Sequence, residues 1–250
     1  MNKEEFVQMD EGGVGRWWYD ARRVMLEREL ANFPLGKEIK ILDLAAACGG
    51  NFEVCSLYGK VVGLDVSWDS MEYCKQKQTT ALVQADAEIL PFAKESIDIV
   101  VALDVFEHLE DDFGSMLEIQ RVLKKDTGKL IFNTPAFMSL FSAHDTAFHH
   151  YRRYRAGELR QKLEEAKLKV DFITYWSFFI FPLVFIVRKL GGLFQRAGEP
   201  AKSDFHLKIP GFIESSLRFF NRVELNMIKK NIFVPFGVSV FGVANKIDWK

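Results

Sequence analysis

Hydrophobic positions along the chain change period several times, and each change marks the border of an expected helix or strand. Short apolar runs predict strands at 39–44, 60–64, 81–83, 96–103, 128–133, 169–174 and 238–245. Helical spacing predicts helices at 14–32, 51–57, 68–77, 113–123 and 156–166, with a long loop after Pro135. Because strands and helices alternate, we expect an α/β fold with a parallel, doubly wound sheet and right-handed crossovers.

The last two expected strands are separated by about 60 residues, far more than an ordinary connection. This segment, 175–234, is apolar and helical in pattern, so it predicts a helical cap inserted before the last strand. We therefore expect one domain with four parts. These are an N-terminal helical segment at 1–35, a core at 36–174, the cap at 175–234 and a last strand within 235–250.

The start of the cap contains no charged residue from Phe172 to Val187. That run is slightly shorter than the roughly 18 residues needed to span a bilayer, and Pro182 interrupts it. Three interpretations stay open: a buried cap, a peripheral membrane contact through 172–190, or a true membrane span.

Composition narrows the function classes. The chain has 250 residues, 48% of them hydrophobic and 27% charged, with a formal net charge of −1. These values suit a globular domain and do not suggest a nucleic-acid partner. Cys48, Cys55 and Cys74 form no Cys-x-x-Cys pair, so neither a disulfide framework nor a metal site is expected. The first residues lack an apolar signal region, and the cytoplasm is the expected location.

Small and acidic residues follow the first two expected strands. Asp43 ends the first strand, and Ala45, Ala47 and Gly49 alternate through the next turn, where small side chains allow a ligand to approach the backbone. Asp65 ends the second strand, 65 − 43 = 22 residues later, which is the spacing of an acid that binds ribose hydroxyls.

The next two strand ends also carry polar groups. Asp86 and Ala87 follow the third strand, where a carboxylate can accept a hydrogen bond from an exocyclic amine. Asp104 follows the fourth strand, and Glu107 and His108 lie just beyond it. Four neighbouring strand ends thus place polar side chains on one edge of the sheet, where open α/β sheets bind ligands.

Together these residues resemble the class I S-adenosylmethionine-dependent methyltransferases, in the small-molecule branch. The resemblance covers about 39–174 and includes the Asp-Ala-Glu-x-Leu-Pro-Phe and Val-Phe-Glu-His-Leu sequences. It implies a Rossmann-like seven-stranded sheet and S-adenosyl-L-methionine as cofactor. It further implies that the cofactor contacts Asp43, Ala45, Ala47, Gly49, Asp65, Val66, Asp86, Ala87 and Asp104.

Two features leave other functions open. Ala45 and Ala47 stand where the family has glycine, so a degenerate protein that binds the cofactor without catalysis is one alternative. An NAD-dependent oxidoreductase is another, because it shares the strand-turn-helix unit and the acid after the second strand. The acidic and histidine residues after the third and fourth strands favour the methyltransferase.

Methyl transfer needs alignment, exclusion of water and, for some acceptors, a base. His108, His149, His150 and Tyr154 are the catalytic candidates, although His108 could instead only orient its loop, and His149 and His150 could be solvated. We expect oxygen to be the atom that is methylated.

The acceptor side of the site is indicated by basic and aromatic residues. Arg153 lies in a basic stretch that could bind an anion, or could form salt bridges in a solvated loop. Trp17 and the phenylalanine-rich cap suit a small-molecule or lipid-linked acceptor, unless these aromatic residues only pack the cap.

Overall fold

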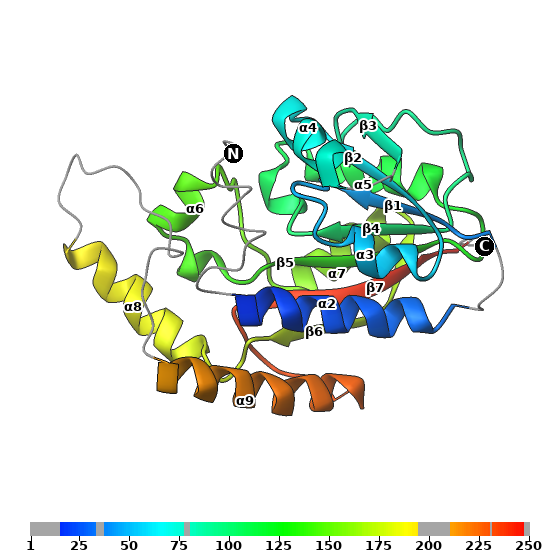
Figure 1. Cartoon of the computed structure of the whole chain (residues 1–250). Helices are drawn as coiled ribbons and strands as arrows, with labels where there is room; N and C mark the ends of the chain where they lie inside the picture. The colour runs from blue at the N-terminus through cyan, green and yellow to red at the C-terminus, as the bar shows by residue number, and fades with distance from the viewer. Residues whose placement is uncertain (1–15, 34–37, 78–80, 195–210, 231, 248–250) are drawn as a thin grey trace.

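The structure, a computed structural model, describes residues 16–33, 38–77, 81–194, 211–230 and 232–247. A seven-stranded sheet in the order β3-β2-β1-β4-β5-β7-β6 forms its centre (Figure 1). The strands are β1 Lys40–Leu44, β2 Lys60–Asp65, β3 Ala81–Gln84, β4 Ile99–Leu103, β5 Lys129–Pro135, β6 Leu168–Trp176 and β7 Ser239–Lys246. The expected α/β fold with a seven-stranded Rossmann-like sheet is confirmed.

Helices cover both faces of the sheet. They are α2 Arg16–Ala31, α3 Phe52–Ser56, α4 Trp68–Lys77, α5 Asp112–Val122, α6 Ala143–Ala147, α7 Ala156–Glu165, α8 Phe181–Phe194 and α9 Gly211–Lys229. Short 3₁₀ turns occupy Phe106–His108 and Met138–Leu140. Side chains of α5 and α7 pack into one apolar core, whereas α2, α3, α4 and α9 contribute to a second core on the other face.

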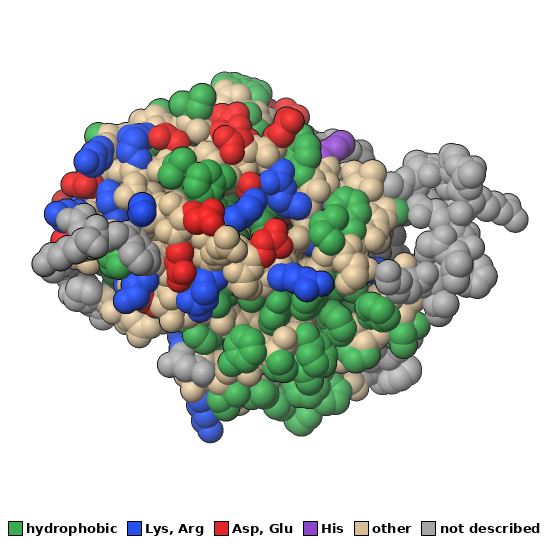
Figure 2. All heavy atoms as spheres, turned by 180° about the vertical axis from the view of Figure 1, so that it is seen from behind, with side chains coloured by type: hydrophobic (Ala, Val, Ile, Leu, Met, Phe, Trp, Pro, Cys, Tyr) green, Lys and Arg blue, Asp and Glu red, His purple; other side chains and the backbone are tan. Residues whose placement is uncertain are grey.

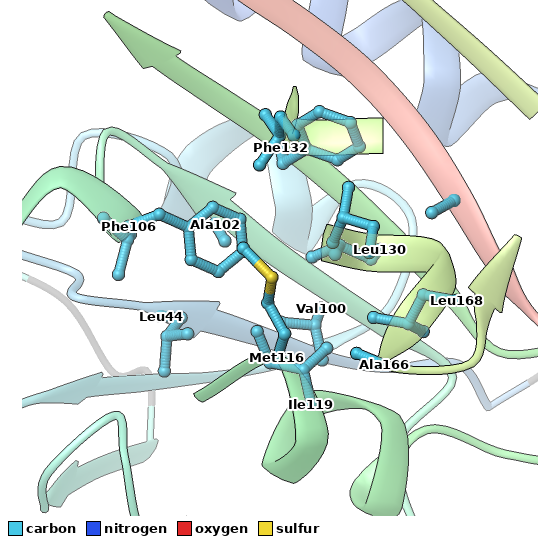
Figure 3. Packing of buried hydrophobic residues seen from close by; sticks show 14 of the residues in the cluster. Leu44, Val100, Ala102, Phe106, Met116, Ile119, Leu130, Phe132, Ala166 and Leu168 are labelled. Atoms are coloured by element: carbon cyan, nitrogen blue, oxygen red, sulfur yellow. The ribbon is translucent and has the colours of Figure 1, made fainter. Parts of the chain in front are cut away.

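Continuous apolar runs make the central strands suited to burial on both faces. Every residue of β4 is buried, and its alternate side chains enter the two different cores. In the first core, Met116 and Ile119 of α5 pack under Val100 and Leu130, as Figure 3 shows. This packing fixes the carboxyl ends of the central strands, from which the polar side chains project.

One feature of the sheet differs from the sequence prediction. Strands β1 to β5 are parallel, but β7 is antiparallel to both of its neighbours, β5 and β6. The prediction of a wholly parallel sheet is therefore wrong for the last strand. The chain leaves β6 at the edge where β1 and β4 also end, and β7 begins at that same edge. The inserted segment consequently emerges beside the polar strand ends.

The loop after β5 also differs from the expectation, because it contains the Met138–Leu140 turn and α6. Within the insertion, α8 and α9 are helical as expected, while residues 195–210 lie outside the described part. The insertion is buried only in part, because Ile228 of α9 lies in the second core whereas other large apolar side chains of α8 and α9 are exposed. Among the described helices, none combines the length and apolarity needed to cross a bilayer.

Candidate functional site

The turn after β1 adopts the backbone shape that its small residues suggest. Ala45 and Ala47 have φ values of 54° and 47°, and Gly49 has a φ of 72°. The two alanines thus keep the left-handed conformation that glycine favours, at some conformational cost. A Cβ on Gly49 would lie 2.8 Å from Cδ2 of Phe52, so this position also needs glycine for space.

Asp65 holds this turn against the end of β2. The backbone N–H groups of Ala47 and Ser67 each donate to one of its carboxylate oxygens at 2.9 Å. A carboxylate offers about four acceptor positions, so two remain for a ligand's hydroxyl groups. Asp65 and the small-residue turn therefore form one unit, as the sequence spacing suggested.

Asp43 lies behind the turn and is 1% exposed. Its Oδ1 accepts a hydrogen bond from Asn51 Nδ2 at 3.0 Å, whereas Oδ2 has no partner within the described residues. Burial raises the pKa of Asp43 to about 7, against the opposing effects of Asn51 and the nearby Arg22. A cationic ligand placed beside Oδ2 would favour the ionised form.

Val66, Asp86 and Ala87 lie beyond β2 and β3. Val66 is 67% exposed, an apolar surface beside Asp65 that a planar group could cover. Asp86 is exposed, and its Oδ1 accepts from the backbone N–H of Glu88 at 2.9 Å, while Ala87 is buried. Their cofactor contacts stay predictions.

Asp104, after β4, takes part in a network that reaches the N-terminal helix. It has a φ of 59°, pairs with Arg22 of α2, and accepts a hydrogen bond from Asn133 of β5. Asn133 in turn accepts from the indole N–H of Trp176 at 2.7 Å. This network brings α2 to the carboxyl edge of the sheet. Trp17 also belongs to α2, but its side chain lies outside the described part of the structure, so its predicted contact with the acceptor stays a prediction.

Glu107 is completely buried in the 3₁₀ turn after β4. Thr134 Oγ1 donates to its Oε2 at 3.0 Å, and Oε1 has no partner in the described part of the chain. Burial and the nearby Asp104 raise the pKa of Glu107 well above its usual range. Arg22 Nε and Asn51 Oδ1 are also buried without hydrogen bonds among the described residues. Unmet buried groups at one sheet edge are what a polar ligand would satisfy.

His108 and His150 lie next to Glu107. Their ring centroids are 4.6 Å apart, and one ligand-type atom from each of the three residues lies within 4.8 Å of the others. Such a carboxylate and two imidazoles could also bind a divalent transition metal. Desolvation and the neighbouring His150 lower the pKa of His108 to about 4, so it is neutral at pH 7.

Asp145 orients His150. His150 Nδ1 lies 2.9 Å from Asp145 Oδ1, and Arg153 and Arg188 also pair with this carboxylate. Despite its burial, these partners hold the pKa of Asp145 below its usual range, so it is a carboxylate at neutral pH. With Nδ1 directed at Asp145, Nε2 of His150 is the nitrogen left to meet a substrate. His149 is exposed.

Two predicted residues have places that do not fit their predicted roles. The Tyr154 hydroxyl is buried, 2.7 Å from Asp112 Oδ2, and burial raises the pKa of this phenol far above its usual value. Arg153 is 4% exposed, and its Nε donates to Asp145 at 2.7 Å. Neither side chain is free to act on an acceptor, because each is held inside the fold.

The structure also adds Arg22, Asn51, Asn133 and Asp145 to the candidate site. Arg22 lies in the N-terminal helix, 82 residues before Asp104, so the sequence gives no sign of their pairing. Asp145 had no signal, because its partners come from residues 150–153 and from α8.

Comparisons with known proteins agree with this arrangement. Residues 42–132 match the family model of the methyltransferase domain. A probable S-adenosylmethionine-dependent methyltransferase of Mycolicibacterium smegmatis is 27% identical over 161 residues, which cover 62% of this chain and 60% of that protein. A malonyl-[acyl-carrier protein] O-methyltransferase of Legionella pneumophila is 36% identical over 105 residues, 38% of this chain and 36% of that protein. The chain thus spans about 60% or less of these relatives.

A similar fold occurs in a putative methyltransferase of Haloferax volcanii, solved in complex with the Trm112 methyltransferase activator. The TM-score is 0.63 at 16% identity, and the match covers 99% of this chain and 95% of that one. The matched segment contains Asp43, Asp65 and Asp104, and the similar fold surrounds it. Residues 42–132 therefore match a methyltransferase domain, and the chain is similar to S-adenosylmethionine-dependent methyltransferases in sequence and in fold.

Proposed function

We propose that the protein transfers a methyl group from S-adenosylmethionine to an oxygen atom of a small or lipid-like acceptor. The observation that carries the proposal is a group of buried polar atoms at the carboxyl edge of the sheet that have no hydrogen-bond partner among the described residues, namely those of Asp43, Asn51, Arg22 and Glu107. The Legionella relative is named an O-methyltransferase of a malonyl group on acyl carrier protein, which supports oxygen as the acceptor atom.

The residues of this edge fit the cofactor. When bound, S-adenosylmethionine supplies an electrophilic methyl group on a positively charged sulfur. Asp43 offers a free carboxylate oxygen to the cationic methionine part, and Asp65 offers acceptor positions to ribose hydroxyls. Val66 offers an exposed apolar surface to the adenine. These assignments follow the family resemblance; Val66 is exposed, whereas Asp43 and Asp65 are buried.

His150 is the best candidate for the base that removes the acceptor's proton. Asp145 fixes its ring and stabilises the imidazolium that forms when Nε2 takes the proton. The cofactor, when bound, would supply the methyl group to the acceptor oxygen and leave as S-adenosylhomocysteine. Burial raises the pKa of Glu107 well above its usual range, which favours the protonated carboxyl, a hydrogen-bond donor at this edge of the sheet.

The sheet argues against the dehydrogenase alternative. The classic dinucleotide-binding sheet has the strand order 3-2-1-4-5-6, whereas here an antiparallel β7 lies between β5 and β6. A cofactor-binding protein without catalysis stays an alternative, and the test below separates it from the enzyme.

Calorimetric titration with S-adenosylmethionine, S-adenosylhomocysteine and NAD tests the cofactor. We expect both methionine-derived ligands to bind, and affinity weaker than about millimolar for both would refute the proposal. Methyl transfer is then measured with labelled cofactor and cell extract, with aqueous and lipid products separated. Labelled product supports an enzyme, and its absence from every fraction despite tight binding supports the non-catalytic alternative.

Variants of three histidines test the base. We expect His150→Gln to lose about 10²-fold or more of the transfer rate, as is typical when a general base is removed. His149→Gln and His108→Gln serve as controls and should lose less of the rate. His149 is exposed, and the lowered pKa of His108 makes it a weak base. Unchanged binding of S-adenosylhomocysteine shows that each variant is folded. If His150→Gln retains full rate, another group removes the proton.

A further inference from the structure

The surface of the insertion is apolar over a large contiguous area. Most of the exposed large hydrophobic residues of the described chain lie on α8, on α9 and just after α9. We define the insertion face by six of them, Leu183, Ile186, Phe219, Phe220, Val223 and Phe233, which are 40% to 62% exposed except for Val223 at 37%. Figure 2 shows hydrophobic side chains gathered at this end of the molecule. Such a patch on a folded protein indicates an interaction site.

The charge of the insertion indicates what this face contacts. Residues 177–238 contain nine lysine and arginine residues and four acidic ones, a net charge of +5. The whole chain has −1, so the remainder carries −6. On α9, Arg222 and Lys229 are exposed, and its one described acid, Glu224, is buried. Two such faces would repel each other, whereas phenylalanine and leucine beside basic residues suit the surface of an anionic bilayer.

An aromatic row joins the insertion face to the sheet edge. Phe220 stacks on Phe179 with ring centroids 5.0 Å apart. From there, contacts of 4.6 to 5.9 Å run through Phe178, Phe236 and Phe181 to Phe137. Phe137 follows β5, next to the edge that carries Glu107. Arg188 of α8 also pairs with Asp145, the residue that orients His150.

We propose that the insertion face docks on an anionic lipid bilayer, with the carboxyl edge of the sheet close to the membrane surface. The six apolar side chains enter the interface while Arg222 and Lys229 bind lipid phosphates. If the proposed function is also right, the aromatic row leads a lipid-linked acceptor from the bilayer to the site. The docking itself does not depend on methyl transfer.

Vesicle co-sedimentation of the full-length protein tests the docking. We expect binding to vesicles of phosphatidylcholine with phosphatidylglycerol to exceed binding to phosphatidylcholine alone by at least tenfold. Phe219→Ser/Phe233→Ser removes apolar area from the face and should weaken binding at least tenfold. Leu57→Ser/Leu117→Ser changes two exposed apolar residues elsewhere on the surface and should leave binding unchanged. Arg222→Glu/Lys229→Glu should remove the preference for anionic lipid.

Several results would overturn the proposal. The first is no binding to anionic vesicles, and the second is equal weakening of binding by both apolar variants. The third is a dimer in ultracentrifugation that Phe219→Ser/Phe233→Ser dissociates, because the face would then be a protein interface. Thermal unfolding is measured in every variant as the test of folding. Failure of the unaltered protein to bind either methionine-derived ligand, with intact vesicle binding, would refute the proposed function alone, and the reverse would refute the docking alone.

Discussion

Replacing Ala45 and Ala47 by glycine should stabilise the protein, because both alanines hold positive φ values, 54° and 47°. The left-handed conformation costs a non-glycine residue about 1–2 kcal/mol. Glycine returns about 0.4–1 kcal/mol of this through the greater freedom of its unfolded chain. The net gain is about 0.5–1 kcal/mol per site, or roughly 1–2 kcal/mol for Ala45→Gly/Ala47→Gly. For a chain of this size the midpoint of thermal unfolding should rise by roughly 2–8 °C.

Ala46 provides the matched control inside the same turn. It is buried and is not among the residues with positive φ, so Ala46→Gly should lower the unfolding free energy by about 0.5–1 kcal/mol or more. Urea and thermal unfolding measure the stability of both variants, and calorimetry measures their affinity for S-adenosylhomocysteine. We expect that affinity to change little, because the turn already has its glycine-like shape. A destabilised double variant, or one that matches Ala46→Gly, would refute the reasoning.

Three further predictions follow from the site. With a pKa of about 7, Asp43 is protonated at acidic pH, so affinity for the cationic cofactor should rise between about pH 6 and 8; titration calorimetry of Asp43→Asn should show no such rise. Tyr154→Phe should cost about 1–2 kcal/mol in urea unfolding by removing the bond to Asp112, yet leave methyl transfer nearly unchanged; a large rate loss would restore its catalytic role. Asp65→Ala should weaken cofactor binding by about 1–3 kcal/mol, and unchanged affinity would place the ribose elsewhere.

The strands could be predicted because each central strand is a continuous apolar run. Such a run indicates burial on both faces of the sheet, and nearly every residue of β1, β2 and β4 is at least partly buried. The sequence also predicted that the acidic residues after these strands lie at one edge of the sheet, because the carboxyl ends of parallel strands meet there. The direction of β7 was not predictable, because the apolar pattern of a strand is the same whether it pairs in a parallel or an antiparallel direction. Arg153 was assigned to an acceptor because its neighbours are basic, but its partner Asp145 belongs to a helix within an expected loop.

The sequence did not distinguish a buried from an exposed insertion for a related reason. An apolar run indicates that a side chain avoids water, and it does so equally for a protein core and for a lipid interface. Only the position of α8 and α9 relative to the two cores distinguishes these cases, and the sequence pattern of 175–234 contains no information on that position. In the structure, Phe219 and Phe233 are exposed and so lie outside both cores.

The pairing of Trp176 with Ser239 makes the insertion, topologically, the loop of a β-hairpin. The entropy of closing a loop grows only with the logarithm of its length, so a loop roughly fifteenfold longer than a tight turn costs about 2 kcal/mol more. The sheet can therefore accept loops of very different size and chemistry at this point without a change in register. Proteins with this sheet could therefore differ in acceptor and in location through this one loop. The small-residue turn after β1, which β4 and β5 separate from β7, would stay the same.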